Sequence, residues 1–228
     1  MSRALVCILI ISLALTAILP AQEVLRGQVW VELEPMPGQF INDPNPPDLQ
    51  TLRRRALEEA SLFFSDMVYG WSFHYDIGER VRDIDEELEL KPLGTIPWGD
   101  PGLFATDAEM RDQRFYVWAD FRPNEIQQRR LRTWKTGTTR SVQAIGHGPL
   151  GGSVEVSAWV TIKQAALEDA ARSAIRTILR GSERNRPKAV EGFISLAEFP
   201  LFWMDAGQWT ASGRFRVNVT EVIPFAAY

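Results

Sequence analysis

Two stretches of the chain carry apolar residues at helical spacing, and residues that start and end helices lie at their boundaries. Asp48 is placed to cap a first helix over 48–69, which Gly70 ends. Thr161, with a glutamine three residues later, has the pattern of a capping box, and Gly181 closes the second helix. Each helix therefore has one apolar stripe that must be buried. These stripes are Leu49, Leu52, Ala56, Ala60, Phe63, Phe64 and Met67, and Leu167, Ala170, Ala171, Ala174, Ile175 and Ile178.

Alternation of apolar and polar residues predicts strands on both sides of each helix. A segment rich in Pro and Gly, 94–112, is predicted to be a loop. Residues 122–140 contain six basic residues and are predicted to be a connector with a short helix or strand. The predicted strands are 27–34, 71–76, 88–92, 114–121, 141–145, 153–160, 189–196, 200–204 and 208–222. Of these, 141–145 and 153–160 are predicted to pair as a hairpin.

The two helices also resemble each other. Ala56-Leu-Glu-Glu-Ala60 matches Ala166-Leu-Glu-Asp-Ala170, and similar elements surround both segments. The sequence therefore predicts an α+β fold of two β-α-β-β units that arose by duplication, each with one long amphipathic helix packed on a mainly antiparallel sheet. The alternative is that helices rich in Ala, Leu and Glu look alike by composition. The expected organisation is a signal peptide at 1–21, a first unit at 22–121, a basic connector at 122–140 and a second unit at 141–228.

The first 21 residues have the features of a signal peptide. Arg3 supplies a positive charge, Ala4 to Leu19 is uncharged and apolar, and Pro20-Ala21 offers a cleavage point. The apolar run is about 16 residues, shorter than the roughly 20 that span a bilayer, although retention as an anchor stays open. Cys7, the single cysteine, lies within this run, so the expected mature chain contains no disulfide or thiolate metal site. Removal of Arg3 shifts the net charge from −4 to −5, which does not favour nucleic-acid binding.

Few residues suggest catalysis or metal binding. Ser72, His74 and Asp76 share one strand face, but alternate residues on a strand are about 6.5 Å apart, too far for a catalytic triad. His147 lies in a Gly-rich stretch that fits no phosphate-binding pattern. The carboxylates between Asp83 and Glu89 lack the glycine and spacing of a calcium loop. We therefore expect no cofactor, no metal and no catalytic residue.

Eight tryptophans are the more unusual feature of the sequence. Four lie at apolar strand positions and are expected in the core: Trp30, Trp71, Trp118 and Trp159. The other four lie near loops or turns, where an exposed ring stacks on sugars or partner proteins. These candidate contact residues are Trp98, Trp134, Trp203 and Trp209.

The strand and Ala-rich helix over Val154–Leu179, followed by a strand hairpin, resemble a domain of bacterial envelope lipoproteins. They are also similar to the N-terminal domain of flagellar assembly protein T. The resemblance covers about 70 residues, rests on alanine spacing and strand order, and includes no signature residue. It implies a periplasmic or outer-membrane-associated binding or assembly module without catalysis.

Together these patterns predict an exported protein, periplasmic or secreted, with peripheral or no membrane association after signal cleavage. Its expected partner is an envelope protein or a peptidoglycan component, contacted through a bare sheet edge or through the aromatic loops around Trp98 and Trp203. The sequence leaves two alternatives open. One is an envelope hydrolase, and the other is a glycan- or peptidoglycan-binding module that uses exposed tryptophans.

Overall fold

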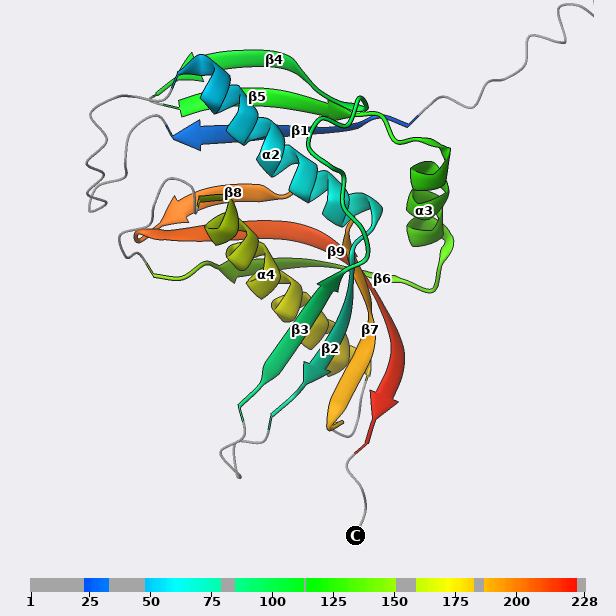
Figure 1. Ribbon diagram of the computed structural model, residues 1–228. Helices are drawn as coiled ribbons and strands as arrows, with labels where there is room; N and C mark the ends of the chain where they lie inside the picture. The colour runs from blue at the N-terminus through cyan, green and yellow to red at the C-terminus, as the bar shows by residue number, and fades with distance from the viewer. Residues whose placement is uncertain are drawn as a thin grey trace, which may run out of the picture.

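The computed structural model describes residues 23–32, 48–78, 85–112, 114–150, 159–182 and 187–224, except for the side chains of Trp159, Gly181 and Ser182. Within these ranges the fold is α+β, as predicted, with helices packed against antiparallel sheets (Figure 1). The predicted signal peptide and the segment 153–158 of the predicted hairpin lie outside the described residues. The helices are α2 (Leu49–Val68), α3 (Glu125–Thr136) and α4 (Trp159–Ser182). The strands are β1 (Leu25–Glu32), β2 (Trp71–Asp76), β3 (Glu87–Pro92), β4 (Leu103–Arg111), β5 (Arg114–Phe121), β6 (Arg140–His147), β7 (Ala189–Leu196), β8 (Leu201–Asp205) and β9 (Gln208–Ile223).

The helix boundaries follow capping chemistry. The Asp48 carboxylate accepts a hydrogen bond from the backbone N–H of Thr51 at 2.6 Å, as an N-cap should. Gly70 has a φ of +66°, a conformation that suits glycine, directly after α2. Inside the predicted connector, Asn124 and Gln127 form a reciprocal capping box that starts α3. The second long helix already begins at Trp159, so the predictions of a strand as far as Val160 and of an N-cap at Thr161 are wrong.

In the part of the chain that the structure describes, one sheet consists of three strands and the other of six. The small sheet has the order β1-β5-β4, and α2 packs on it. The larger sheet has the order β3-β2-β7-β9-β6, and β8 pairs with β9. Strand β9 is long enough to pair with β6 and β8 through its first part and with β7 through its second. The prediction of a loop over 94–112 is wrong in part, because β4 lies within this range and pairs with β5.

The two predicted units are not separate bodies. Strand β2, from residues 22–121, pairs along its full length with β7, from residues 141–228. The units nevertheless share a pairing pattern: β1-β5-β4 in the first has the same form as β6-β9-β8 in the second. This parallel is what a duplication would produce, and the duplication itself stays a prediction.

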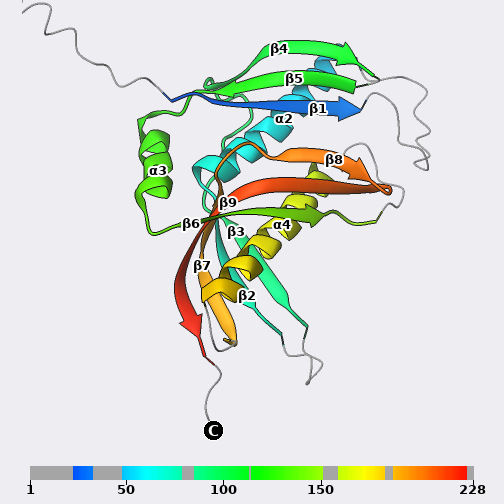
Figure 2. The same ribbon diagram turned by 180° about the vertical axis from the view of Figure 1, so that it is seen from behind.

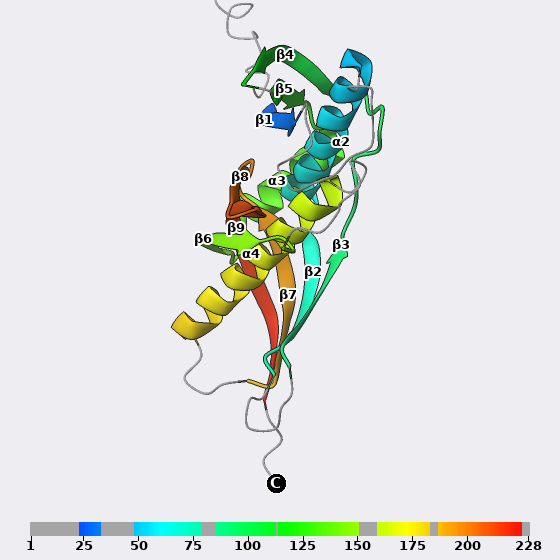
Figure 3. The same cartoon turned by 90° about the vertical axis from the view of Figure 1, so that its left-hand side faces the viewer.

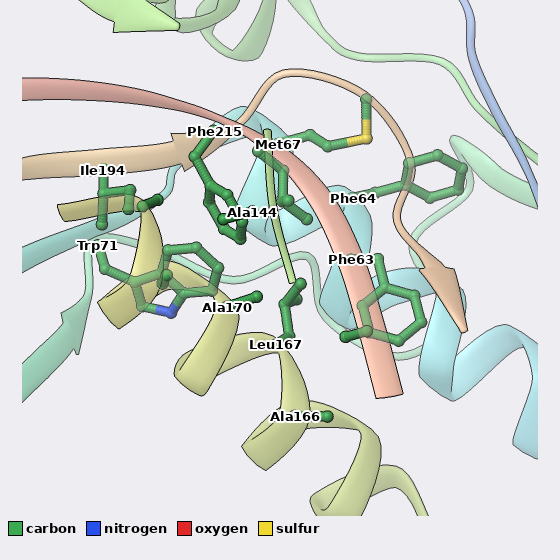
Figure 4. Close-up of a cluster of buried hydrophobic side chains, with 14 of the residues drawn as sticks. Phe63, Phe64, Met67, Trp71, Ala144, Ala166, Leu167, Ala170, Ile194 and Phe215 are labelled. Carbon is green, nitrogen blue, oxygen red and sulfur yellow. The ribbon is translucent and has the colours of Figure 1, made fainter. Parts of the chain in front are cut away.

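A single hydrophobic core joins the two halves. Figure 4 shows Phe63, Phe64 and Met67 of α2 near Leu167 and Ala170 of α4, with strand residues between them. The backbone of α4 lies very close to β6, since a Cβ on Gly146 would be 2.6 Å from the Cα of Ala170. Small residues are therefore required where this helix crosses the sheet.

Helix α2 lies in front of β1 and β5 in the view of Figure 1, and the first half of α4 lies in front of β6, β8 and β9. The larger sheet twists, so the second half of α4 lies on the other side of β2 and β7 in this view (Figures 1 and 3). Seen from behind, β4, β5, β1, β8, β9 and β6 follow one another down the molecule, with α2 and the first half of α4 behind them (Figure 2). We call the side of the strands opposite these helices the outer face. Several side chains on this face are exposed, among them Trp118, Ile145, Leu201 and Trp203.

Candidate functional site

The outer face of the small sheet carries aromatic rings between arginines. On β5, Phe115, Val117 and the following alternate residues point into the core, which directs Tyr116 and Trp118 outward. The guanidinium of Arg26 lies 4.8 Å from the centre of the Trp118 ring. This cation–π contact places a positive charge beside the Trp118 ring and leaves part of the ring exposed. Similar contacts place Arg111 over Tyr116 and Arg114 over Trp30, at 4.7 and 4.2 Å.

The outer face of the larger sheet carries a strip of exposed apolar side chains. Strand pairing places Ile145 of β6 and Leu201 of β8 on either side of Ser212 in β9. The next row contains Trp203 beside Thr210. Leu201 is 69% exposed, and Ile145 and Trp203 are also exposed. We call Ile145, Leu201 and Trp203 the apolar strip. Exposed hydrophobic side chains that are neighbours on two strands are typical of contact surfaces.

A hollow of about 220 Å³ opens at the other end of the same sheet, over β3, β2, β7 and β9. His74 lies in its lining, with Nδ1 2.8 Å from Glu191 Oε1 and Nε2 3.4 Å from Asp76 Oδ2. The hydrogen bond to Glu191 and the two negative charges raise the pKa of His74 above its usual 6.5. The hollow therefore favours a protonated histidine held between two carboxylates. Its lining residues are Ser72, Phe73, His74, Glu89, Lys91, Glu191, Gly192, Phe193 and Thr220.

The hollow does not assemble a catalytic triad from Ser72, His74 and Asp76. The Ser72 hydroxyl donates to the carbonyl of Lys91 at 3.5 Å, while His74 is engaged by carboxylates. The three side chains are therefore not linked as nucleophile, base and orienting group. Among the described residues, no group of three or more His, Cys, Asp or Glu side chains is arranged to hold a metal ion.

The predicted contact tryptophans divide into two pairs. Trp98 and Trp203 are exposed, at 52% and 39%, whereas Trp134 and Trp209 are only 8% and 5% exposed. Trp134 lies on α3 and donates its indole N–H to the carbonyl of Val68 at 3.1 Å, so it caps the end of α2. The prediction that Trp134 and Trp209 offer surface contacts is therefore wrong.

The predicted core tryptophans divide in a similar way. Trp71 is buried as expected, but Trp118 is exposed on the outer face and Trp30 is only partly buried. The side chain of Trp159 lies outside the described residues. Sequence reasoning missed Trp118 because aromatic residues occupy both faces of β5, so alternation alone does not show which face is buried.

A second charged group lies inside the molecule, between the two halves. The Lys163 ammonium on α4 donates to Glu59 of α2 at 2.6 Å and to the carbonyl of Trp30 at 3.0 Å. The rings of Trp30 and Trp209 each lie 4.8 Å from the ammonium nitrogen. Burial raises the pKa of Glu59, and the neighbouring Lys163 opposes this rise. Both side chains are almost fully buried and paired, so this group serves packing rather than ligand binding.

The chain resembles known proteins in sequence. One protein-family model matches residues 14–225. An uncharacterized protein of Treponema pallidum (strain Nichols) is 26% identical over 203 residues, which cover 88% of this chain and 81% of that protein. No solved structure matches the chain significantly.

Proposed function

We propose that this chain, which belongs to the protein family whose model matches residues 14–225, is an exported, non-catalytic protein of the cell envelope that binds a partner protein. The name of the Treponema relative states no activity. Support for the proposal therefore comes from the surface of this chain and from its first residues.

The apolar strip is the observation that carries the proposal. Ile145, Leu201 and Trp203 come from two strands on either side of β9, and the helix-free side of the sheet leaves them exposed. Burial of apolar surface drives most protein association. A partner that covers the strip would remove its apolar surface from water, and large aromatic side chains such as Trp203 are often among the residues that contribute most to binding.

Export is supported by the charge and apolar pattern of residues 1–21. The described residues contain no helix that is long and apolar enough to cross a membrane. Fractionation of cells that express the full chain, with N-terminal sequencing of the product, tests this part of the proposal. We expect a product that begins near Gln22 in the exported fraction. A cytoplasmic product that retains Met1 would contradict export.

The partner is tested by affinity capture from envelope extracts of the native host, with a chain that begins at Gln22. A double variant, L201S/W203S, removes most of the apolar strip, while W98S removes an exposed tryptophan that lies over Arg54 of α2 instead. We expect one protein to be recovered with the unaltered chain and W98S but lost with L201S/W203S. Equal recovery with all three chains, or no specific protein with any of them, would contradict the proposal.

A glycan-binding role has one supporting observation. Trp118 and Tyr116 present partly exposed rings between arginines on the small sheet, and flat aromatic rings suit stacking on sugars. Sedimentation with purified peptidoglycan tests this alternative. If it holds, the unaltered chain sediments with the polymer and W118A remains in solution, while L201S/W203S behaves as the unaltered chain.

A further inference from the structure

We propose that the hollow over β2 and β7 is a binding site for a single sugar ring, stacked on Phe193 and hydrogen-bonded by the side chains around it. This site is separate from the apolar strip and from the aromatic rings of the small sheet. It therefore does not depend on the protein contact proposed above.

The size of the hollow limits the ligand. Pockets for drug-sized molecules enclose about 300–1,000 Å³. The hollow encloses about 220 Å³, which suits one small ring better than an extended ligand. It is also open on one side, so a ring that belongs to a longer chain of sugars is able to enter while the rest of the polymer stays in solvent.

The lining has the mixture of groups that a sugar requires. Strand pairing sets Lys91, Ser72 and Phe193 in one row across the sheet. The neighbouring row contains Glu89, His74 and Glu191. Charged and hydroxyl side chains that donate and accept hydrogen bonds therefore surround one partly exposed aromatic ring. A sugar presents the matching pair of features, hydroxyls at its edge and an apolar C–H face.

A peptide matches this surface less well than a sugar. Extended peptides are commonly bound by adding a strand to a free sheet edge, through main-chain hydrogen bonds. Both β2 and β7 are central strands that pair with a neighbour on each side, so their backbone groups are already engaged. Recognition in the hollow depends on side chains alone.

The position of His74 adds order to the site. Its ring contacts Glu191, which lines the hollow, and Asp76 on the same strand. The second carboxylate oxygen of Glu191 is free of any hydrogen bond to His74, whose contact uses Oε1. Glu191 is thus able to accept from a sugar hydroxyl while it orients the histidine.

The test is titration of the chain from Gln22 with two neutral trisaccharides, chitotriose and cellotriose, followed by saturation-transfer NMR and calorimetry. We expect transfer to the sugar ring protons and an affinity in the millimolar to micromolar range. F193A removes the stacking surface and should weaken binding about tenfold, and E191Q should also weaken it. W118A and L201S/W203S lie outside the hollow and should bind the sugar as the unaltered chain does.

Phe193 is partly exposed, so F193A should keep the thermal unfolding temperature of the unaltered chain, which separates lost binding from lost folding. Absence of transfer from both sugars at millimolar concentration would overturn the proposal. So would equal affinity in F193A and the unaltered chain, or binding of short peptides in place of sugars. If W118A loses binding and F193A does not, the sugar binds at the small sheet. This result would also overturn the proposal.

Discussion

Lys163 is a charged residue that is almost fully buried, and its contribution to the stability of the fold depends on its partners. Its ammonium is satisfied by Glu59, by the carbonyl of Trp30 and by two indole rings. K163M keeps the apolar part of the side chain but leaves the Glu59 carboxylate buried without its nearest cation. We expect a loss of about 3–5 kcal/mol in the free energy of unfolding at pH 7, measured with urea.

A double variant provides the control for this pair. K163M/E59L removes both charges and should recover most of the lost stability, because a buried ion pair and a well-packed apolar pair are often close in free energy. The loss in K163M should also shrink at low pH, where Glu59 accepts a proton. A double variant that is less stable than K163M would contradict the view that unpaired charge causes the loss.

His74 makes folding stability depend on pH through its contact with Glu191. The fold raises the histidine pKa above 6.5, so the contact contributes most below pH 6.5 and its contribution is lost as pH rises through the folded-state pKa. Because His74 and Glu191 are both well exposed, the contribution should stay below about 1 kcal/mol. NMR titration of the imidazole should give a pKa above 6.5 in the unaltered chain and a lower value in E191Q. A pKa at or below 6.5 in the unaltered chain would contradict the contact.

At the scale of the elements, the contact of α4 with β6 requires a glycine at position 146, which has no side chain. A Cβ on Gly146 would overlap with the backbone of Ala166 and Ala170, and backbone is unable to move aside as the end of a side chain does. G146A should therefore destabilise the protein by about 1–3 kcal/mol or more in urea unfolding. S141A, at an exposed position of the same strand, should change stability by less than about 0.5 kcal/mol. Equal stability of G146A and S141A would show that the helix and strand lie farther apart.

Local sequence patterns predicted the elements that are buried on one side and missed those that are not. Helix α2 was predictable because it has one apolar stripe and clear boundaries, and strand β5 was predictable because aromatic and β-branched residues make up most of it. Strand β4 was predicted as loop because almost all of its residues are exposed at a sheet edge, so burial imposes no alternation on them. The beginning of α4 was predicted as strand because short apolar runs fit both periods.

Even less of the candidate site could be predicted from the sequence. His74 and Glu191 are 117 positions apart and meet only because β2 and β7 pair. Nothing in the local sequence of either strand indicates this pairing. The exposure of four tryptophans was predicted from their position near loops. This prediction is correct for Trp203 and wrong for Trp209, whose ring packs against Lys163 beneath the strands.

At the scale of the whole molecule, the pairing of β2 with β7 makes each half dependent on the other. Residues 22–138 contain Trp71, and residues 139–228 contain Ile194, its buried neighbour across the pair. Each fragment alone would expose this surface, so we expect neither to show a cooperative unfolding transition by circular dichroism. Co-expression of both fragments should restore a soluble complex that unfolds cooperatively, because the break between α3 and β6 leaves every strand pair intact. Cooperative unfolding of residues 139–228 alone would show that the second half is an independent domain, and the shared sheet would then be a contact between two folded units.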